Sequence, residues 1–534
     1  MAAALACPLT VVDPVVELAP VSLGLCGACL PGLVVLIAAS LVAVTAYQWL
    51  RGDPTRKARR RSKAFSTASQ ASAEPPAAPV AKPKRSYPEY GIEEVRKHAS
   101  PKDAWVAIGE GIYDMTKWAP YHPGGKHSIL NIAGRDVTDV FDAFHHDPRM
   151  QQKLESFRIG TLVGYTPSQL VQDFRALERE LHEKALFEVD DWFFLNRWAI
   201  TLLPFLAAVT LIVRFQGDTG VQLLGAALVG LFWWQLAFLG HDAGHRSHMN
   251  NRDSDQFIGY CMILPLLGIG PEWWMDSHNT HHVVCNDIHH DPDIQHLPFL
   301  AISPKFFESL YSVYHGHVMT FDFLGRCLVS IQHIIYYPVM CVSRPFLYVQ
   351  SFIHLLKRPK NRLYEIAAYV IFFAWNTLLA SYFQGGWARL GYVLMSTAAS
   401  GILHVQITLS HFSMPVTQQP LFRNDEECWM VTQLATTLDV DCHPWMDWFH
   451  GGLQFQAIHH LFPKLPRYHL RKVQGLVREL AAKHGVEYHC VPFVEANVKT
   501  YETLKTTAKQ ASRAWASDFK FGDSMLYEGI NLIG

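Results

Sequence analysis

The chain has 534 residues, a formal net charge of −1, 49% hydrophobic residues and only 17% charged residues. Soluble domains carry about 25% charged residues, so this composition favours a protein embedded in a bilayer. The length allows more than one domain. The balanced charge gives no support to a nucleic-acid partner or an acidic substrate.

The N-terminal 50 residues end in an apolar, uncharged run over 21–50 that is long enough to span a membrane. A basic run from Arg51 to Lys63 follows directly, which favours a cytosolic position for what comes next. We interpret residues 1–50 as a hydrophobic anchor. The alternative is a signal segment followed by a basic, Ser-rich, transit-like stretch. Residues 51–86 are a basic and Pro/Ala/Ser-rich linker.

Residues 87–165 are polar, contain no spanning run and predict a small soluble domain. A charged helical pattern over 166–197 predicts a connecting helix, and 198–500 form a membrane domain followed by a tail over 501–534. The membrane domain contains two pairs of apolar stretches: 198–215 with 221–239, and 363–383 with 387–409. The apolar segments 256–270 and 328–353 are short or interrupted, so we expect interfacial or buried helices there.

Histidine is the most informative residue type, with 28 in the chain. Because each pair of spans returns the chain to the same face, histidines near 241, 278 and 459 can meet on the side that carries the small domain. Ten cysteines show no secreted disulfide pattern, and Cys26 and Cys29 are interpreted as packing residues. No C-x-x-C-H run occurs, so any haem is held without a covalent link.

In the small domain, His122-Pro-Gly-Gly125 and Phe141-Asp-Ala-Phe-His145 place two histidines 23 residues apart. Imidazoles on opposite walls of an apolar pocket can ligate haem iron on both faces, and such a haem only transfers electrons. An incidental histidine in a Pro-Gly-Gly turn is the plain alternative. His146 is adjacent to His145 and is a second candidate for the same role.

Three further histidine clusters have spacings that suit metal binding. They are H-x-x-x-H (His241, His245), H-x-x-H-H (His278, His281, His282) and Q-x-x-H-H (Gln456, His459, His460). On a helix, residues three or four apart share a face, so each cluster can present its imidazoles to one metal. Seven histidines and one glutamine exceed the needs of a single ion, and two neighbouring metals are expected. Imidazole-rich sites without thiolates suit iron, zinc, copper or nickel.

Both sets of motifs resemble known families. His122-Pro-Gly-Gly, Gly134-Arg-Asp-Val-Thr138 and Phe141-x-x-Phe-His145 resemble cytochrome b5 domains over about 80 residues. The three clusters, in this order between paired spans, resemble the membrane fatty-acid desaturase and hydroxylase superfamily. Gln456 in place of the first histidine of the third cluster is typical of its front-end branch, whose members carry an N-terminal cytochrome b5 domain.

The resemblance implies a fold, a set of cofactors and a reaction. The fold is a small α+β haem domain fused to an all-α transmembrane domain of about four core spans, interfacial helices and a cytosolic cap, with an extra N-terminal span. His122 and His145 are the implied axial ligands of a non-covalent haem b, and the seven box histidines hold two irons. Gln456 ligates iron or holds an iron-bound water. With O₂ as co-substrate, the irons remove two hydrogens from adjacent carbons of a membrane lipid.

The resemblance also implies cytochrome b5 reductase as the electron source and a multi-pass location in the endoplasmic reticulum membrane, with both cofactor sites cytosolic. A plastid membrane is the alternative if the N-terminus is a bipartite targeting segment. His411 is a candidate additional ligand, while His404 is expected to be structural. His248, His289 and His290 flank the boxes, where Asp291 and Asp293 could partner them.

Residues 437–467 most resemble the C-terminal part of Δ8 desaturases that act on sphingolipid long-chain bases, and so does the short gap before 290–298. A front-end polyunsaturated acyl desaturase of the Δ5, Δ6 or Δ8 type is the alternative. Ala457-Ile458 departs from the branch's commoner pair and weakens the transfer of substrate choice. Two other classes are a lipid hydroxylase, which would add oxygen, and an anchored, non-enzymatic electron donor, which would lack box iron.

Overall fold

The computed structural model describes residues 86–357, 362–418 and 428–514. The predicted N-terminal anchor, nearly all of the linker and most of the tail lie outside these residues. The described residues fall within one compact unit, Pro79–Gly534. Within it, the predicted combination of an α+β domain and a mainly helical domain with about four apolar helices is confirmed.

The small domain is built around a six-stranded sheet with the order β1-β6-β4-β3-β2, and β5 pairs with β3. Its strands are β1 (Glu89–Tyr90), β2 (Ala99–Ser100), β3 (Asp103–Ile108), β4 (Gly111–Asp114), β5 (Arg135–Asp136) and β6 (Arg158–Leu162). Its helices are α3 (Ile92–Lys97), α4 (His127–Leu130), α5 (Thr138–Phe144) and α6 (Pro148–Leu154). Strands β3 and β4 are mostly buried and form the floor of the domain.

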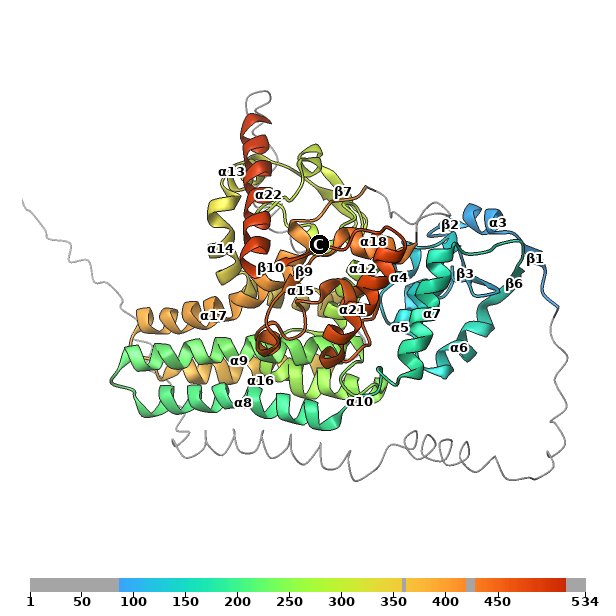
Figure 1. Ribbon diagram of the computed structural model, residues 1–534. Helices are drawn as coiled ribbons and strands as arrows, with labels where there is room; N and C mark the ends of the chain where they lie inside the picture. Colours follow the sequence, from blue (N-terminus) through green and yellow to red (C-terminus); the bar gives the residue numbers. More distant parts are fainter. Residues whose placement is uncertain (1–85, 358–361, 419–427, 515–534) are drawn as a thin grey trace, which may run out of the picture. The chain divides into compact units, whose positions relative to one another are not determined.

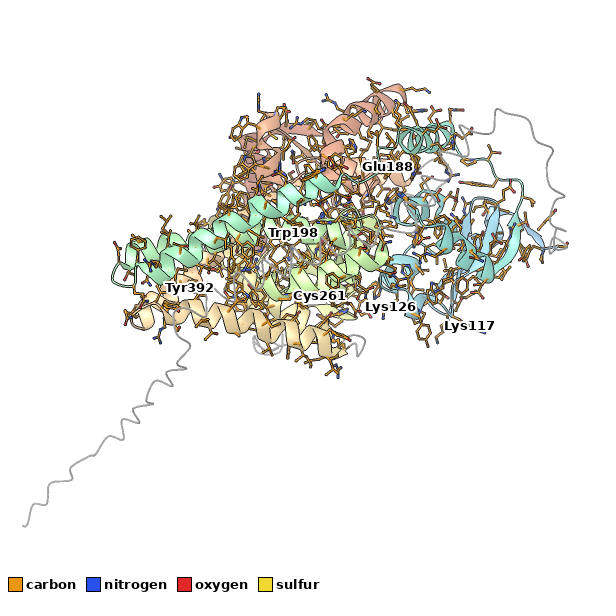
Figure 2. All side chains as sticks on the ribbon, turned by 90° about the horizontal axis from the view of Figure 1, so that it is seen from below. Lys117, Lys126, Glu188, Trp198, Cys261 and Tyr392 are labelled. Atoms are coloured by element: carbon orange, nitrogen blue, oxygen red, sulfur yellow. The ribbon has the colours of Figure 1, made fainter. Side chains whose placement is uncertain are left out.

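Four helices are long and apolar enough to cross a membrane: α8 (Asp191–Arg214), α9 (Thr219–His245), α16 (Arg362–Ser381) and α17 (Gly386–Phe412). They run alongside one another (Figure 1). Exposed side chains such as Leu203 and Val370 are suited to contact lipid tails. Trp198 and Tyr392 mark α8 and α17 in Figure 2, where Lys117 and Lys126 mark the small domain.

The first span starts earlier than the apolar run predicts. The Asp190 side chain accepts a hydrogen bond from the backbone N–H of Trp192, which caps α8 at Asp191. Arg197 remains compatible with this helix because its guanidinium lies over the Phe193 ring, 5.1 Å from the centroid. Hydropathy alone therefore placed the start of the span too late, since capping and side-chain snorkelling extend the helix beyond the apolar run.

The segments predicted as interfacial or buried are helical but broken. Residues 256–270 form the end of α10 (Arg252–Phe257), a π-helical turn (Ile258–Ile263) and α11 (Leu264–Leu267). Helices α14 (Gln332–Val342) and α15 (Arg344–Lys357) are bent by 65° at Ser343. Pro345 in the first turn of α15 explains the break, because proline has no N–H to donate to the carbonyl four residues earlier and its ring clashes with that carbonyl.

The remaining elements cover one end of the membrane helices (Figure 1). The helices are α7 (Gln169–Glu183), α12 (Pro271–Val283), α13 (Phe323–Ser330), α18 (Trp429–Thr436), α19 (Asp447–His450), α20 (Gln456–Leu461), α21 (Arg467–Lys483) and α22 (Phe493–Ala514). The strands are β7 (Leu310–Ser312) with β8 (His317–Met319), and β9 (Asp439–Asp441) with β10 (Cys490–Pro492). Arg467 ties α21 to α9, since its Nε donates to Asp242 at 2.7 Å and both side chains are largely buried.

One hydrophobic cluster joins the small domain to this cap. It contains Val106 of β3, Phe174 of α7, and Ile458 and Phe462 in and after α20. Residues from both domains therefore bury apolar surface together, which stabilises their contact by roughly 25 cal/mol per Å² of apolar area removed from water. The small domain is positioned by packing as well as by its covalent connection.

Candidate functional site

The predicted axial pair lies close together in the small domain, with the ring planes tilted by 45°. The ring centroids of His122 and His145 are 6.1 Å apart. Their Nδ1 atoms donate to the backbone carbonyls of Gly125 and Phe141, each at 3.0 Å, which leaves both Nε2 atoms available to a metal. Burial lowers the pKa of both imidazoles, that of His145 to about 3, and so keeps them in the neutral form that binds iron. These residues fit a bis-imidazole haem.

The neighbouring His146 does not share this geometry. Its ring contacts the rings of His182 and Phe187 edge-on, with centroid distances of 4.7 and 4.6 Å. His145, by contrast, is stacked on Phe141 and faces His122. Of the two candidates that the sequence left open, His145 is the one whose ring is turned to the opposite axial histidine.

The H-P-G-G loop lies directly on α12, the helix of the second histidine box. A Cβ atom on Gly125, which has a φ of +88°, would lie 2.0 Å from Oδ1 of Asp276. A Cβ on Gly124 would lie 3.3 Å from the Asn279 amide nitrogen. Glycine is required at 125 both for its left-handed backbone and for this close approach.

The three boxes come together as predicted, at the ends of helices from distant parts of the chain. His241, His245, His278 and His459 form one group, in which the ligand atoms lie within 4.8 Å of one another. His281, Cys285, His411 and His460 form a second group within the same limit. The two groups could hold two neighbouring metal ions. Gly244 allows α9 to approach α12 closely, since a Cβ there would lie 2.0 Å from the Trp274 ring.

His282 lies between the two groups. Its Nε2 is 3.2 Å from Nε2 of His278, and its ring is stacked on His460 with centroids 4.1 Å apart. It also contacts the rings of His245 and His459. Two imidazole nitrogens this close must share a proton or a metal ion, because two lone pairs repel each other at that distance.

Second partners orient several of these rings. His281 Nδ1 lies 2.9 Å from Asp291 Oδ2, and His278 Nδ1 lies 3.2 Å from Asp293 Oδ2. His460 Nδ1 donates to Gln433 at 2.8 Å. Hydrogen bonds of this kind fix the tautomer and direct Nε2 toward a metal. The aspartates thus support box histidines, not the flanking histidines that the sequence suggested.

Buried nitrogens without a protein partner are the strongest sign of a metal centre. Within the described part of the chain, the box histidines contribute six of them: Nε2 of His241, both nitrogens of His245, Nδ1 of His282, Nε2 of His459 and Nε2 of His460. Leaving a buried polar atom unpaired costs about 1–3 kcal/mol, so a set of this size calls for a ligand. Burial and the neighbouring imidazoles hold the pKa of His282, His459 and His460 well below the ordinary value, which favours metal-binding neutral rings. The donor set fits two irons.

His281 has the opposite electrostatic environment. Burial disfavours its charged form, but the carboxylates of Asp291 and Asp293 outweigh burial and raise its pKa to about 9. A metal bound at Nε2 would take the place of that proton and balance the buried carboxylate of Asp291.

His411 joins the second group, and its Nε2 lies 3.2 Å from the Gln456 amide nitrogen. The Gln456 Oε1 is buried without a partner among the described residues. Cys285, which the sequence analysis did not single out, is four residues after His281, and its Sγ is 3.5 Å from His411 Nδ1. Burial raises the pKa of the Cys285 thiol far above its usual range, so the thiol is neutral unless a bound metal takes the place of its proton.

The other candidate histidines make hydrogen bonds to residues outside both groups. His248 Nε2 accepts from the Trp198 indole at 2.9 Å, His289 Nδ1 donates to the Tyr311 carbonyl, and His290 Nδ1 lies 2.7 Å from Asp287. His404 contacts Ser343 Oγ at 2.6 Å and the Met340 carbonyl at 2.9 Å. These bonds give each residue a structural role.

A cavity of about 520 Å³ opens on the metal groups. His241, His278, His281, His411 and Gln456 lie on its wall. Its apolar lining includes Ile263, Leu267, Phe346, Leu347 and Leu403. A long hydrocarbon chain bound there would place methylene groups against the histidine cluster.

Comparison with known proteins agrees with this arrangement. Residues 92–163 match the family model described as cytochrome b5-like heme/steroid binding domain, and residues 219–492 match the fatty acid desaturase model. The chain is 41% identical over 421 residues to a Delta(8)-fatty-acid desaturase of Helianthus annuus, covering 78% of this chain and 91% of that protein.

Two other relatives carry different descriptions. An acyl-lipid (9-3)-desaturase of Borago officinalis is 38% identical over 423 residues, covering 78% of this chain and 93% of that protein. A Delta 8-(E)-sphingolipid desaturase of Kluyveromyces lactis is 42% identical over 298 residues, covering 54% of this chain and 51% of that protein.

His145→Ala should abolish the low-spin haem spectrum while leaving iron at the boxes, because only one axial imidazole would remain. Absorption and electron paramagnetic resonance spectra of the purified full-length protein, with iron analysis, measure both. His146→Ala is the matched control and should keep the low-spin signal. A normal bis-imidazole spectrum in His145→Ala would contradict the assignment.

Asp291→Asn should weaken iron binding by about 10–100-fold, the usual effect of losing a carboxylate that orients a ligating histidine. Iron retained per chain after equilibration with a graded series of chelator concentrations measures the effect. Asp441→Asn, on the exposed end of β9, serves as the control. Equal iron retention in the two variants would show that Asp291 does not support a metal ligand.

Proposed function

The chain belongs to the fatty acid desaturase family, as a front-end desaturase with a fused cytochrome b5-like domain, and we propose that it introduces a Δ8 double bond into sphingolipid long-chain bases. As a member of that family it is an oxygen-dependent oxidoreductase whose domains imply a haem and two irons. When bound, the haem supplies single electrons and the irons activate O₂ for removal of two hydrogens.

We propose specific ligands for these cofactors. His122 and His145 are the axial ligands of the haem. The irons are held by the box histidines, with His411 as an additional ligand and Gln456 beside it: His241, His245, His278, His281, His282, His459 and His460. Support comes from the converging ring nitrogens, from their lack of protein partners and from the aspartates behind them.

The observation that carries the function is the junction of the two histidine groups with an apolar cavity. The protein's contribution is to hold a saturated hydrocarbon chain of the lipid against the metals. It also excludes water from that part of the lipid. The box histidines form the wall, while α14 and α15 complete the apolar lining on the other side. A soluble substrate would gain little from such a lining, whereas a lipid chain loses its contact with water there.

The substrate class is supported by the relatives named above. Two of the three are described by the same position, Δ8, although one name refers to fatty acids and the other to sphingolipids. The resemblance of residues 437–467 to long-chain-base desaturases favours the sphingolipid. An acyl substrate is the alternative, and the Borago acyl-lipid desaturase supports it.

We propose that electrons pass from the haem site of the small domain to the histidine boxes through Phe144. This residue directly precedes His145, and its ring contacts the ring of His282 edge-on, with centroids 6.0 Å apart. The H-P-G-G loop also packs closely on α12, which gives the small domain a second contact with the helix that carries His282. A single aromatic side chain therefore separates the backbone of one cofactor site from a ligand of the other.

We further propose cytochrome b5 reductase as the electron source and the endoplasmic reticulum as the location, with both sites cytosolic. The basic run after Leu50 supports this orientation. The four apolar helices support a multi-pass membrane protein.

Expression in a yeast that lacks Δ8 unsaturation of long-chain bases should yield sphingoid bases that have lost two hydrogens. Mass spectrometry of sphingoid bases and fatty acids, with the double bond located by fragmentation, measures the product. His460→Ala is the inactive control. A new double bond confined to fatty acids would replace the sphingolipid proposal with the acyl one, and gain of one oxygen would indicate a hydroxylase.

Phe144→Ala should slow oxidation of the pre-reduced haem by O₂ and substrate severalfold, because it removes the only aromatic contact recorded between the two sites in the described structure. Stopped-flow absorption follows the haem directly, and an unchanged low-spin spectrum and potential would exclude damage to the haem site. Phe157→Ala, which alters a contact with Trp118 elsewhere in the same domain, is the control. A wild-type rate in Phe144→Ala would refute this route.

A further inference from the structure

A third cluster of metal-ligating side chains lies outside both cofactor sites. His146, Glu178 and His182 have their ligand atoms within 4.8 Å of one another. His146 follows the α5 helix of the small domain, whereas Glu178 and His182 lie on α7, which connects that domain to the first span. Four residues separate the two α7 side chains, so they share one face of the helix.

One of the three side chains has a buried, unpartnered ring nitrogen, and another is a buried carboxylate. The Nε2 atom of His146 is buried and has no hydrogen-bond partner within the described residues. Glu178 is only 7% exposed. Its neighbour Arg175 is engaged by Asp136 and Asp139, which form ion pairs with that guanidinium. A buried carboxylate requires a cation or a proton, and a buried imidazole nitrogen requires a donor or a metal.

Charged groups of both signs surround the cluster. Burial raises the pKa of Glu178 to about 8, and the carboxylates of Asp142 and Asp139 raise it further, against Arg175 and Arg179. Arg175 is shared with Asp136 and Asp139, so it is not dedicated to Glu178.

Aromatic packing explains part of the cluster but not all of it. The rings of His146 and His182 lie against Phe187, with centroid distances of 4.6 and 4.2 Å. Such contacts account for the orientation of the imidazoles. They do not account for a carboxylate placed beside two imidazoles in a largely buried position.

We propose that His146, Glu178 and His182 bind a zinc ion that fastens α7 to the small domain. Two imidazoles and one carboxylate, with water in the fourth position, form a common tetrahedral zinc set. The exposed His182 gives the ion access from solvent. Oxygen and nitrogen donors without a thiolate are compatible with zinc, and the cluster is distinct from the iron groups.

This ion would hold the small domain in a fixed position relative to α7. His146 directly follows the proposed axial ligand His145, and Glu178 and His182 lie in the last two turns of α7. A metal bond across this contact would restrict rotation of the small domain about the connecting segment. It would also hold the backbone behind the axial ligand.

The test uses the full-length protein loaded with haem and iron. Zinc is titrated at one equivalent, and zinc and iron per chain are measured after removal of unbound metal. We expect one zinc per chain with no loss of iron. X-ray absorption at the zinc edge should show two imidazole nitrogens and light oxygen donors at about 2.0–2.1 Å.

Glu178→Gln and His182→Gln should each weaken zinc binding by more than about 100-fold, since even an outer-shell partner is worth 10–100-fold. Glu183→Gln, an exposed neighbour on the same helix, should bind zinc like the wild type. An unchanged low-spin haem spectrum and iron content verify that the variants fold. With zinc bound, the small domain should also become more resistant to proteolysis between residues 166 and 190.

Three results would overturn the proposal. The first is no zinc retained by the wild type. The second is zinc retained by both α7 variants as tightly as by the wild type. The third is zinc that binds only as iron is lost and whose X-ray absorption shows more than two imidazole ligands. That result would place the zinc in the histidine boxes.

Discussion

The whole site depends on the need of buried imidazoles for a partner at each ring nitrogen. Helix α12 shows this most clearly, because its histidines contact residues from the first and third boxes while Asp291 and Asp293 lie behind them. In His278 and His281 an aspartate binds Nδ1, and the other ring nitrogen is directed into the cluster. Metals bound there would satisfy the remaining ring nitrogens, so assembly of the cap would be coupled to their binding.

Helix α12 also joins the two halves of the molecule. The glycines of the H-P-G-G loop lie against it, and Phe144 contacts His282 near its end. The apolar cluster shared by β3, α7 and α20 buries the rest of the contact. Fusion therefore does more than raise the effective concentration of an electron donor, since the covalent connection and the packing together define one arrangement. A donor that diffuses freely would have to find this interface at every encounter.

The boxes and the cavity that leads to them share helices. The boxes lie at the ends of α9, α12 and α20, and the cavity is lined by α9 and α12 as well as by residues of α14, α15, α17 and the segment 292–300. The bend of 65° between α14 and α15 brings Phe346 and Leu347 into that lining. Relatives with the same boxes can accordingly differ in the lipid they are named for, because box residues determine the reaction and the cavity determines which chain reaches it.

The sequence by itself determined the two-domain fold, the paired spans and the candidate ligands, because apolar run length and helical spacing are local properties. The family resemblance already favoured His145 over His146. Only the tertiary structure showed the His146 ring packed against His182, assigned His411 to a group of possible metal ligands and gave Asp291 its partner. These outcomes depend on contacts between residues far apart in the chain, which no local pattern records. Gln433 illustrates the limit: an ordinary glutamine in an apolar helix supports His460 solely because α18 packs beside α20.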